Sequence, residues 1–351
     1  MSRAHIIGSG FVTGEHKVTN AQMLRMVDTS DEWIRERTGI EERYFVKDGT
    51  TTSDLGARAA EKAMEDAKVS KEEIDYVVFA TMTPDYYFPG CGGLVQKKLG
   101  LRNVPALDIR QQCTGFLFGL QMSDALIRSG QAKTVLLIGA EVHSGFMPWR
   151  CWDHLFGLPG EAPTPEELAL ASQLRDRAVL FGDAAGAVVL RAGGEERGLL
   201  GFSLHSDGDS LEDLYVPGVG FASRPYVDHR QIDAGLPMPV MNGKAVFRMA
   251  VTKIPEAVHE LCAAEGLTVE QIDLLIPHQA NLRINNMVQK VLKLSDERIY
   301  NNIQRYGNTT AATIPIAFDE CRKSGRIKPG ALVCFVGLGA GFHWGAALLR
   351  A

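Results

Sequence analysis

The stretch Asp108-Ile-Arg-Gln-Gln-Cys113-Thr-Gly-Phe-Leu-Phe-Gly119 places a thiol between two runs of different character. Residues 104–109 read as a strand, and residues 116–126 carry apolar side chains at helical spacing. Cys113 therefore lies at or just before a helix N-terminus, where free backbone N–H groups and the helix dipole favour an anion. We expect this setting to lower the pKa of the thiol and to make Cys113 a nucleophile. The alternative is a cysteine that only fills the core.

The composition of the 351-residue chain is typical of a soluble globular protein, with 45% hydrophobic and 23% charged residues. A net charge of -5 gives no basic footprint for nucleic acid or anionic membrane. The sequence shows no signal-peptide pattern and no apolar stretch of membrane-spanning length. We therefore expect a cytoplasmic protein with no nucleic-acid or membrane partner. Six dispersed cysteines without C-x-x-C spacing argue against disulfides and against a metal site.

Strand-like and helix-like segments alternate along the chain, which indicates βαβ units and an α/β fold. Gly8-Ser-Gly10 resembles the start of a dinucleotide-binding motif, but Thr13 stands where the third glycine belongs. We interpret these glycines as a tight turn. The expected strands are residues 5–11, 74–81, 106–109 and 134–139, and the expected helices are residues 20–27, 30–37 and 53–67.

Three segments of the first half of the chain recur, in the same order, in the second half. This recurrence indicates two similar α/β halves, residues 1–193 and 194–351. Such halves pack around a shared core, and a ligand site near their junction is the default expectation. The matching pairs are residues 72–78 with 270–276, residues 127–133 with 322–328, and residues 185–192 with 344–351.

The repeat also relates three polar residues that are far apart in the sequence. At the offset of the second matching pair, Cys113 corresponds to Asn308. At the offset of the first pair, the end of the strand within residues 74–81 corresponds to the position of His278. Equivalent positions of two pseudo-symmetric halves lie near their common axis, so the three side chains can converge. A cysteine with a histidine and an asparagine suits acyl chemistry through sulfur, although a buried structural histidine and a turn asparagine are the simpler alternatives.

Two stretches break the symmetry of the halves. Residues 142–184 form a long insertion that contains Trp149, Trp152, Phe156 and a helical segment. Residues 216–242 are rich in glycine and proline. Long loops in compact domains usually serve as lids or binding loops, so we expect these stretches to cover a site; surface decoration is the alternative.

Four motifs occur in a fixed order: Cys113-Thr-Gly-Phe, Pro277-His-Gln-Ala-Asn281, Gly307-Asn-Thr-Thr-Ala-Ala312 and Gly337-Leu-Gly-Ala-Gly-Phe342. Together they resemble the β-ketoacyl-acyl-carrier-protein synthase III family of the thiolase superfamily. The resemblance covers nearly the whole chain and implies a homodimer with a thiolase-like α/β fold, in which two pseudo-symmetric halves form five αβαβα layers. The further matching segments are Val27–Ile34, Arg37–Ile40 and Phe181–Gly186.

The resemblance also implies a reaction. Cys113 would take an acyl group from acyl-coenzyme A, and His278 and Asn308 would assist decarboxylation of malonyl-acyl carrier protein. The resulting carbanion would attack the acyl-cysteine and start a fatty acid as β-ketoacyl-acyl carrier protein. An oxyanion on the thioester needs fixed backbone donors, and the N–H groups of Cys113 and Ala340 would supply them. No metal and no permanently bound cofactor is implied.

By position, the resemblance assigns residues to substrate binding. Trp33 and Arg177 would sandwich the adenine of coenzyme A. The residues for its nucleotide end are Thr29, Trp33, Arg37 and Arg177, and those for the pantetheine channel are Gly243, Phe247, Ala280 and Asn281. The residues for the acidic carrier protein are Arg283 and Arg248. Phe88 would lie at the dimer interface, at the end of the acyl pocket.

The chain departs from the family pattern in three places. Gln111 and Gln112 stand where short-chain members often carry alanines, and Ala340 stands where glycine is common. The insertion before Arg177 is the largest departure. These differences put the acyl substrate in doubt more than the class of reaction.

Three alternative functions remain open. The same cysteine could pass its acyl group to an oxygen or nitrogen nucleophile, or the protein could join two acyl-coenzyme A molecules head to head. A protein of a different class would be a catalytically silent partner. The simultaneous presence of Cys113, His278 and Asn308 argues against a silent partner, which has no chemical use for all three.

Overall fold

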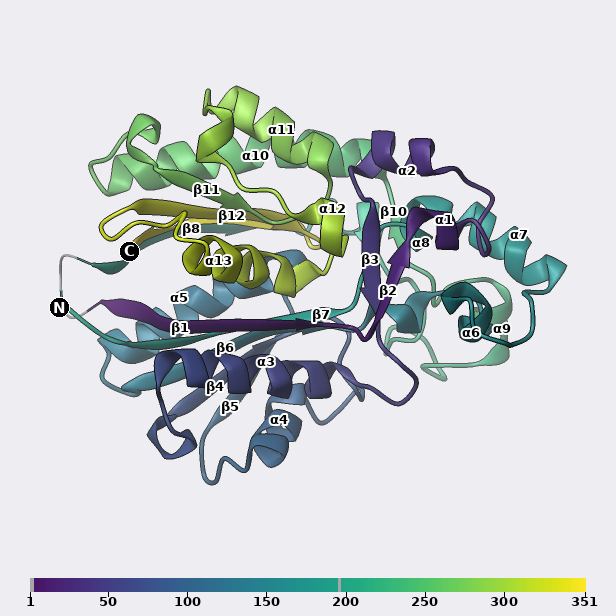
Figure 1. Cartoon of the computed structure of the whole chain (residues 1–351), viewed down its shortest axis with the longest axis horizontal. Helices are drawn as coiled ribbons and strands as arrows, with labels where there is room; N and C mark the ends of the chain where they lie inside the picture. Colours follow the sequence, from purple (N-terminus) through teal and green to yellow (C-terminus); the bar gives the residue numbers. More distant parts are fainter. Residues whose placement is uncertain (1–2, 195–196) are drawn as a thin grey trace.

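The computed structural model describes residues 3–194 and 197–351, and two mixed β-sheets form its centre (Figure 1). The first sheet has the strand order β1-β7-β6-β4-β5. Strands β6, β4 and β5 run parallel to one another, and β7 is antiparallel to both β6 and β1. The strands are β1 (Ala4–Thr13), β4 (Tyr76–Ala80), β5 (Ala106–Ile109), β6 (Thr134–Glu141) and β7 (Ala184–Ala192).

The second sheet repeats this arrangement with the order β11-β12-β13-β8. Strand β11 is parallel to β12, and β13 is antiparallel to both β12 and β8. The place of a fifth strand is taken by a single parallel bridge between Leu275 and Ile299. The strands are β8 (Gly198–Ser206), β11 (Leu274–Pro277), β12 (Leu332–Gly339) and β13 (His343–Arg350).

Helices cover the outer faces of both sheets and also fill the space between them (Figure 1). Helices α3 (Thr52–Ala67) and α4 (Cys91–Leu99) pack on the outer face of the first sheet. Helices α10 (Gly243–Ala264) and α11 (Leu282–Val291) pack on the outer face of the second. Between the sheets lie α5 (Gly115–Arg128) and α13 (Thr313–Lys323). The five layers confirm the expected thiolase-like α/β fold.

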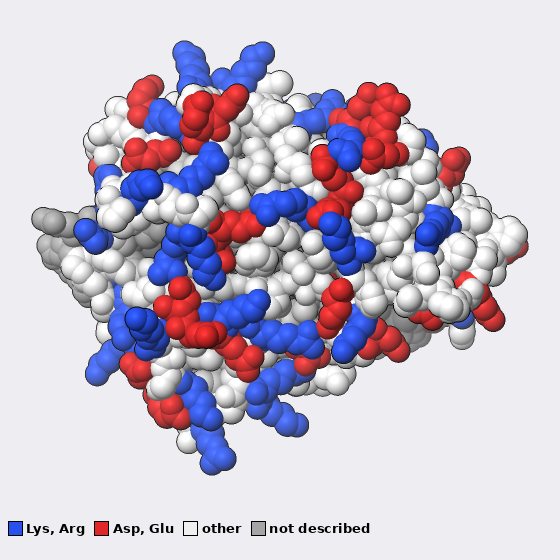
Figure 2. All heavy atoms as spheres, viewed as in Figure 1, with Lys and Arg blue, Asp and Glu red and all other residues white. Residues whose placement is uncertain are grey.

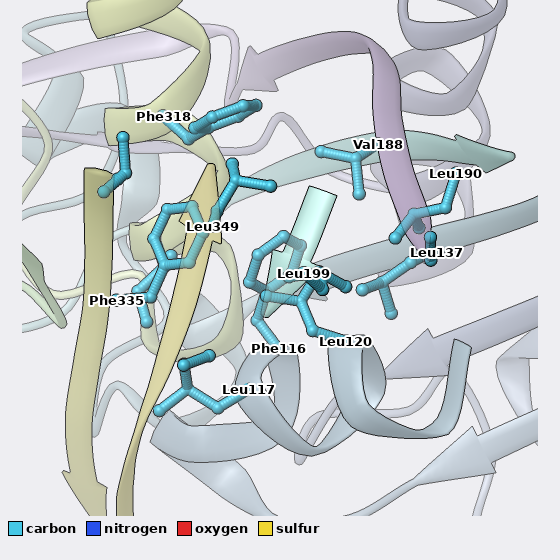
Figure 3. Packing of buried hydrophobic residues seen from close by; sticks show 14 of the residues in the cluster. Phe116, Leu117, Leu120, Leu137, Val188, Leu190, Leu199, Phe318, Phe335 and Leu349 are labelled. Carbon is cyan, nitrogen blue, oxygen red and sulfur yellow. The ribbon is translucent and has the colours of Figure 1, made fainter. Parts of the chain in front are cut away.

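The central core joins the two sheets through these inner helices (Figure 3). Phe116 and Leu120 of α5 and Phe318 of α13 meet apolar side chains of both sheets, such as Leu137 and Phe335. Burial of such side chains is the main favourable contribution to folding. Because both helices are fixed in this core, the short 3-10 turns that lead into them, η2 (Gln112–Thr114) and η7 (Thr310–Ala312), contact each other.

A lobe at one end of the layers contains the insertion predicted from the sequence (Figure 1). It has its own apolar core, in which Trp149, Leu155, Ile34 and Phe45 are buried. The lobe contains β2 (His16–Thr19), β3 (Glu42–Phe45), α1 (Asn20–Met23), α2 (Asp31–Thr38), η3 (His143–Phe146), α6 (Trp152–Phe156), α7 (Pro165–Gln173), α8 (Arg175–Ala178) and α12 (Ile303–Tyr306). The remaining elements are η1 (Lys71–Glu73), η4 (Leu211–Asp213), β9 (Leu214–Tyr215), α9 (His229–Asp233), β10 (Val240–Met241), η5 (Val269–Gln271) and η6 (Asp296–Arg298).

Two local predictions are wrong. Gly8 and Gly10 form no turn and lie inside strand β1. These positions require glycine because α3 crosses the strand too closely for side chains. A Cβ at Gly8 would lie 2.5 Å from the carbonyl oxygen of Ala63. The helix expected over residues 20–27 ends at Met23, and the chain then continues as a turn.

The face of the molecule seen in Figure 2 carries basic and acidic side chains interspersed, without a large area of one sign. No helix among residues 3–194 and 197–351 is both long enough and apolar enough to cross a bilayer.

Candidate active site

A cavity of about 590 Å³ lies where the turns leading into α5 and α13 meet. Cys113, His278 and Asn308 all line it, so the fold brings together three residues from distant parts of the sequence. The other residues expected at a substrate site that line this cavity are Trp33, Arg37, Gly243, Ala280, Asn281 and Ala340.

Cys113 lies in η2, immediately before α5, as the sequence predicted. Its residue is only 9% exposed. Burial raises the pKa of the Cys113 thiol to about 12, and the nearby carboxyl of Glu141 adds to this effect. The expected lowering of this pKa is therefore wrong, because desolvation of a thiolate outweighs the favourable position at the helix start.

Glu141 is a buried carboxyl at the end of β6 that the sequence reasoning missed. Burial raises its pKa to about 7, although several hydrogen bonds act in the opposite direction. Its Oε2 accepts hydrogen bonds from the hydroxyls of Thr81 (3.0 Å) and Thr83 (2.6 Å). The backbone N–H of Met82, another residue of the cavity wall, also donates to the carboxyl, at 3.1 Å. Glu141 thus fixes the loop that follows β4.

His278 follows β11 and is held from both sides. Its backbone N–H donates to the carbonyl of Val336 at 2.7 Å, and its Nδ1 lies 2.7 Å from the hydroxyl of Thr313. Its Nε2 is buried and has no hydrogen-bond partner among the described residues. Burial, and then the neighbouring His143, lower the pKa of His278 to about 3. The imidazole is therefore neutral and carries one proton at physiological pH.

Asn308 is oriented by the turn that follows it. Its Oδ1 accepts a hydrogen bond of 2.9 Å from the backbone N–H of Thr310. The backbone N–H of Asn308 donates to the carbonyl of Leu180 at 2.9 Å, and the N–H of Gly182 donates to the carbonyl of Asn308 at 3.1 Å. These two hydrogen bonds fix its backbone. Because Oδ1 is engaged, the side-chain NH2 group is the end of the amide that remains to donate to a ligand.

His143 supports this region from behind and is another residue that the sequence reasoning missed. Its Nδ1 lies 2.9 Å from the carbonyl of Gly182, which can only accept, so Nδ1 carries the proton. Its Nε2 then accepts from the hydroxyl of Thr310, at 3.2 Å. The ring stacks on Phe181, with 4.7 Å between ring centroids. Burial lowers the pKa of His143 to about 4, so it acts as a neutral brace.

The cavity extends to α2, where the sequence predicted the nucleotide end of the substrate. Two guanidinium groups lie near the ring of Trp33: the Cζ of Arg175 is 4.8 Å from the ring centroid, and that of Arg37 is 5.9 Å. Arg177 does not line the cavity. Its Nη1 donates to the carbonyl of Pro239 at 2.6 Å, and its Nε pairs with Asp176 at 3.0 Å. The guanidinium of α8 that lies beside Trp33 is thus that of Arg175, which, like Arg177, is not in the cavity wall.

Five other predicted residues lie outside the cavity wall. Phe247 packs against the core of the second sheet, and Thr29 precedes α2 with its hydroxyl buried and unpaired within the described part of the chain. Arg248 and Arg283 are exposed on the outer helices α10 and α11. Phe88 is 78% exposed and contributes nothing to the cavity of its own chain.

Both asymmetric stretches contribute to the cavity, as expected. Phe146 and Leu180 line it from the insertion, and Val216, Pro239 and Met241 line it from the second stretch. By contrast, Trp149 of the insertion is buried in the core of the lobe, and Trp152 packs beside it. Of the two glutamines before the nucleophile, Gln112 lines the cavity, and so does Arg110. Within the described residues, no group of three or more His, Cys, Asp or Glu side chains could hold a metal ion.

Comparison with known proteins agrees with this geometry. Family models described as 3-Oxoacyl-[acyl-carrier-protein (ACP)] synthase III and as its C-terminal part match residues 107–160 and 168–208 and residues 262–351. The beta-ketoacyl-[acyl-carrier-protein] synthase III of Rhodospirillum rubrum is 43% identical over 356 residues, which covers 100% of both chains. That of Clostridium acetobutylicum is 40% identical over 350 residues, covering 100% of this chain and 99% of the relative.

Among solved structures, the synthase III of Thermus thermophilus has a TM-score of 0.85 and 36% identity, and the match covers 99% of each chain. The likeness extends over the sheets, the inner helices and the lobe alike. The chain belongs to the β-ketoacyl-[acyl-carrier-protein] synthase III family.

Proposed function

We propose that this protein catalyses the first condensation of fatty-acid synthesis, from acyl-coenzyme A and malonyl-acyl carrier protein to β-ketoacyl-acyl carrier protein. The observation that carries the proposal is the presence of Cys113, His278 and Asn308 in the wall of one cavity. A nucleophile alone suits many acyl transfers. Two neutral hydrogen-bond donors beside it are the additional feature that decarboxylation requires.

In the first half-reaction, Sγ of Cys113 attacks the thioester carbon of acyl-coenzyme A. A new C–S bond forms, the bond to coenzyme A breaks, and the thiol proton leaves with the coenzyme A thiol. Because the pKa of the buried thiol is about 12, its deprotonation accompanies the attack. The N–H groups of Cys113 and Ala340 stabilise the oxyanion; the second of these residues lines the cavity next to the first.

In the second half-reaction, the malonyl carboxylate leaves as CO2 and its bonding electrons form an enolate on the thioester. His278 donates to this oxygen from Nε2 and Asn308 from its NH2 group. Neither donor carries a negative charge that would repel the enolate. The carbanion then attacks the acyl carbon, the bond to Cys113 breaks, and the thiolate takes up a proton.

The residues around the cavity indicate which part of each substrate binds where. Trp33 and Arg37 in the wall, with Arg175 beside Trp33 but outside the wall, supply an aromatic face and two cations for an adenine nucleotide. Gly243 and Asn281 mark the start of α10 and α11 at the cavity wall, and we assign these to the pantetheine channel. Arg248 and Arg283 lie further along the same two helices, exposed, where an acidic carrier protein could reach them.

We also propose that the protein is cytoplasmic and forms a homodimer. Each chain would consist of two halves, residues 1–193 and 194–351. Strand β5 is one of the two edge strands of the first sheet. Near it, Tyr87 contacts Phe221 and Arg110, and Phe221 stacks on Tyr226 at 5.0 Å. Phe88 and Phe221 are 78% and 66% exposed. A second copy would cover this edge and these rings, and would bring its Phe88 to the acyl pocket.

The test uses a panel of acyl-coenzyme A thioesters, followed by malonyl-acyl carrier protein. Digestion and mass analysis should find the acyl group on the Cys113 peptide, with no label in the Cys113→Ala variant. Release of CO2 and formation of β-ketoacyl-acyl carrier protein should follow. Labelling without CO2 release would instead favour transfer to an oxygen or nitrogen nucleophile, and absence of labelling with every thioester would contradict the mechanism.

A further inference from the structure

Thr313, the first residue of α13, connects the catalytic imidazole to the turn that holds Asn308. Its Oγ1 lies 2.7 Å from Nδ1 of His278 and 2.9 Å from the carbonyl oxygen of Thr310. Both distances are those of good hydrogen bonds. Thr313 is 2% exposed and His278 4% exposed, so water does not compete for either contact.

The hydroxyl has one proton but two possible acceptors. In one arrangement it donates to the carbonyl of Thr310, and Nδ1–H of His278 donates to Oγ1. The Nε2 atom then bears a lone pair. In the other arrangement the hydroxyl donates to Nδ1, the proton of the neutral imidazole lies on Nε2, and Oγ1 faces the carbonyl of Thr310 without a hydrogen bond. The orientation of the Thr313 hydroxyl therefore determines which nitrogen of His278 carries the proton.

Only the second arrangement suits the role assigned to His278. An enolate oxygen needs a donor, whereas a lone pair on Nε2 would repel it. The imidazole cannot become a donor at both nitrogens by protonation, because burial holds the pKa of His278 near 3. The tautomer must therefore be set by the partner of Nδ1, and the hydroxyl of Thr313 is the only hydrogen-bond partner of Nδ1 among the described residues.

We propose that the hydroxyl of Thr313 selects the Nε2–H tautomer of His278 and so makes the histidine a donor for decarboxylation. Thr313 is thereby a positioning residue, and the proposal rests on the function proposed above. Thr310 and Thr313 then orient both donors: the N–H of Thr310 fixes the amide of Asn308, and the hydroxyl of Thr313 fixes the imidazole.

The simpler interpretation is that Thr313 only stabilises the start of α13, since threonine often bonds a carbonyl of the preceding turn. The two interpretations differ in what they predict for the half-reactions. A helix-start role affects the stability of the protein and both half-reactions together. Tautomer selection affects decarboxylation alone.

The test compares four variants: Thr313→Val, Thr313→Ser, Thr309→Val and His278→Ala. Thr309→Val is the matched control, because the buried hydroxyl of Thr309 in the same turn has no partner within the described residues. We expect Thr313→Val to acylate Cys113 at the wild-type rate and to lose decarboxylation on the order of 10- to 100-fold, as is common when a histidine loses the partner of its second nitrogen. Thr313→Ser and Thr309→Val should retain both half-reactions.

Nitrogen NMR of labelled His278 gives an independent readout that does not depend on activity. The wild-type protein should show protonated Nε2 and unprotonated Nδ1, and Thr313→Val should lose this preference. A wild-type spectrum with protonated Nδ1 would overturn the proposal even if Thr313→Val fails to fold. Full decarboxylation in Thr313→Val, or an equal loss in Thr309→Val, would also overturn it while leaving the function intact. Decarboxylation that survives in His278→Ala would instead contradict the function assigned to this histidine.

Discussion

Gly339 lies directly against Cys113, so that the last turn of the second sheet closes on the nucleophile of the first half. A Cβ at position 339 would lie 2.9 Å from the Cβ of Cys113 and 3.0 Å from its backbone nitrogen. The same turn continues to Ala340, which lines the cavity. The two groups assigned to the oxyanion hole therefore depend on one close backbone approach.

The first prediction concerns this contact. Gly339→Ala should displace η2, cost about 1–3 kcal/mol of unfolding free energy, and slow acylation of Cys113 by acyl-coenzyme A. Denaturant unfolding and mass analysis of the Cys113 peptide measure the two effects. Gly93→Ala is the control, because a Cβ at Gly93 in α4 meets no atom within 4 Å. Acylation of Gly339→Ala at the wild-type rate would contradict the prediction, because the turn could then shift without affecting the reaction of Cys113.

The second prediction concerns Glu141, whose carboxyl raises the pKa of the Cys113 thiol. Glu141→Gln removes this negative charge, so the pKa of the thiol should fall and more thiolate should be present at a given pH. A fall of one pKa unit gives about a tenfold faster reaction with iodoacetamide at pH 8. The difference from the wild-type protein should shrink below pH 7, since the pKa of Glu141 is about 7 and the wild-type carboxyl is then largely neutral.

Glu61→Gln, an exposed position on α3, serves as the control for this measurement. Its Cys113 should react at the wild-type rate throughout the pH range. Equal alkylation rates of Glu141→Gln and the wild-type protein at pH 8 would mean that Glu141 acts only by holding the loop after β4.

The sequence was sufficient to predict that Cys113, His278 and Asn308 meet at one cavity, because the repeat has a geometric meaning. Cys113 and Asn308 precede the two inner helices, and a shared core forces the starts of these helices together. The partners of His278 and Asn308 could not be predicted in the same way. Thr313, His143 and Glu141 are ordinary residues in the sequence, and their roles exist only because the fold buries them beside one another.

The same limit applies to the assignment near the lobe and explains the error in β1. Carrying residues over by position gave Arg177, whereas Arg175, two residues earlier in α8, has its guanidinium over Trp33; neither arginine lines the cavity. Gly8 and Gly10 were misread because the need for glycine there comes from α3, which lies far along the sequence.

The third prediction separates these two arginines. Arg175→Ala should raise the KM for acyl-coenzyme A about 2- to 5-fold, as expected for loss of one partly exposed cation–π contact, with little change in kcat. Arg177→Ala should mainly lower stability, because it removes the bond to the carbonyl of Pro239. Steady-state kinetics and thermal unfolding distinguish the outcomes. A larger KM effect in Arg177→Ala would restore the assignment made from sequence.

The fourth prediction concerns the polarity of the amide of Asn308. In Asn308→Asp one carboxylate oxygen can still accept from the N–H of Thr310, so the fold should be retained. The other oxygen replaces a donor with a negative charge that repels the enolate. Acylation of Cys113 should persist while CO2 release falls by roughly 100-fold or more, as for removal of an oxyanion donor. Equal losses in the two half-reactions would contradict a role restricted to decarboxylation.

The last prediction addresses which acyl group the cysteine carries. Arg110 lines the cavity, and the ion pairs of the described residues do not include it, although its charge opposes the effect of burial, which raises the pKa of Asp108. The nearby Asp108 instead accepts the backbone N–H groups of Cys91 and Gly92, the latter at 2.9 Å. A guanidinium in this wall favours acyl chains that carry an oxygen or a carboxylate.

In Arg110→Ala, Cys113 should therefore be acylated less by succinyl-coenzyme A and no less by butyryl-coenzyme A. Competition between the two thioesters, followed by mass analysis of the Cys113 peptide, measures the ratio. The side chain of Gln111 does not line the cavity, so Gln111→Ala is the control and should keep the wild-type ratio. An unchanged ratio in Arg110→Ala would show that this arginine does not select the acyl chain.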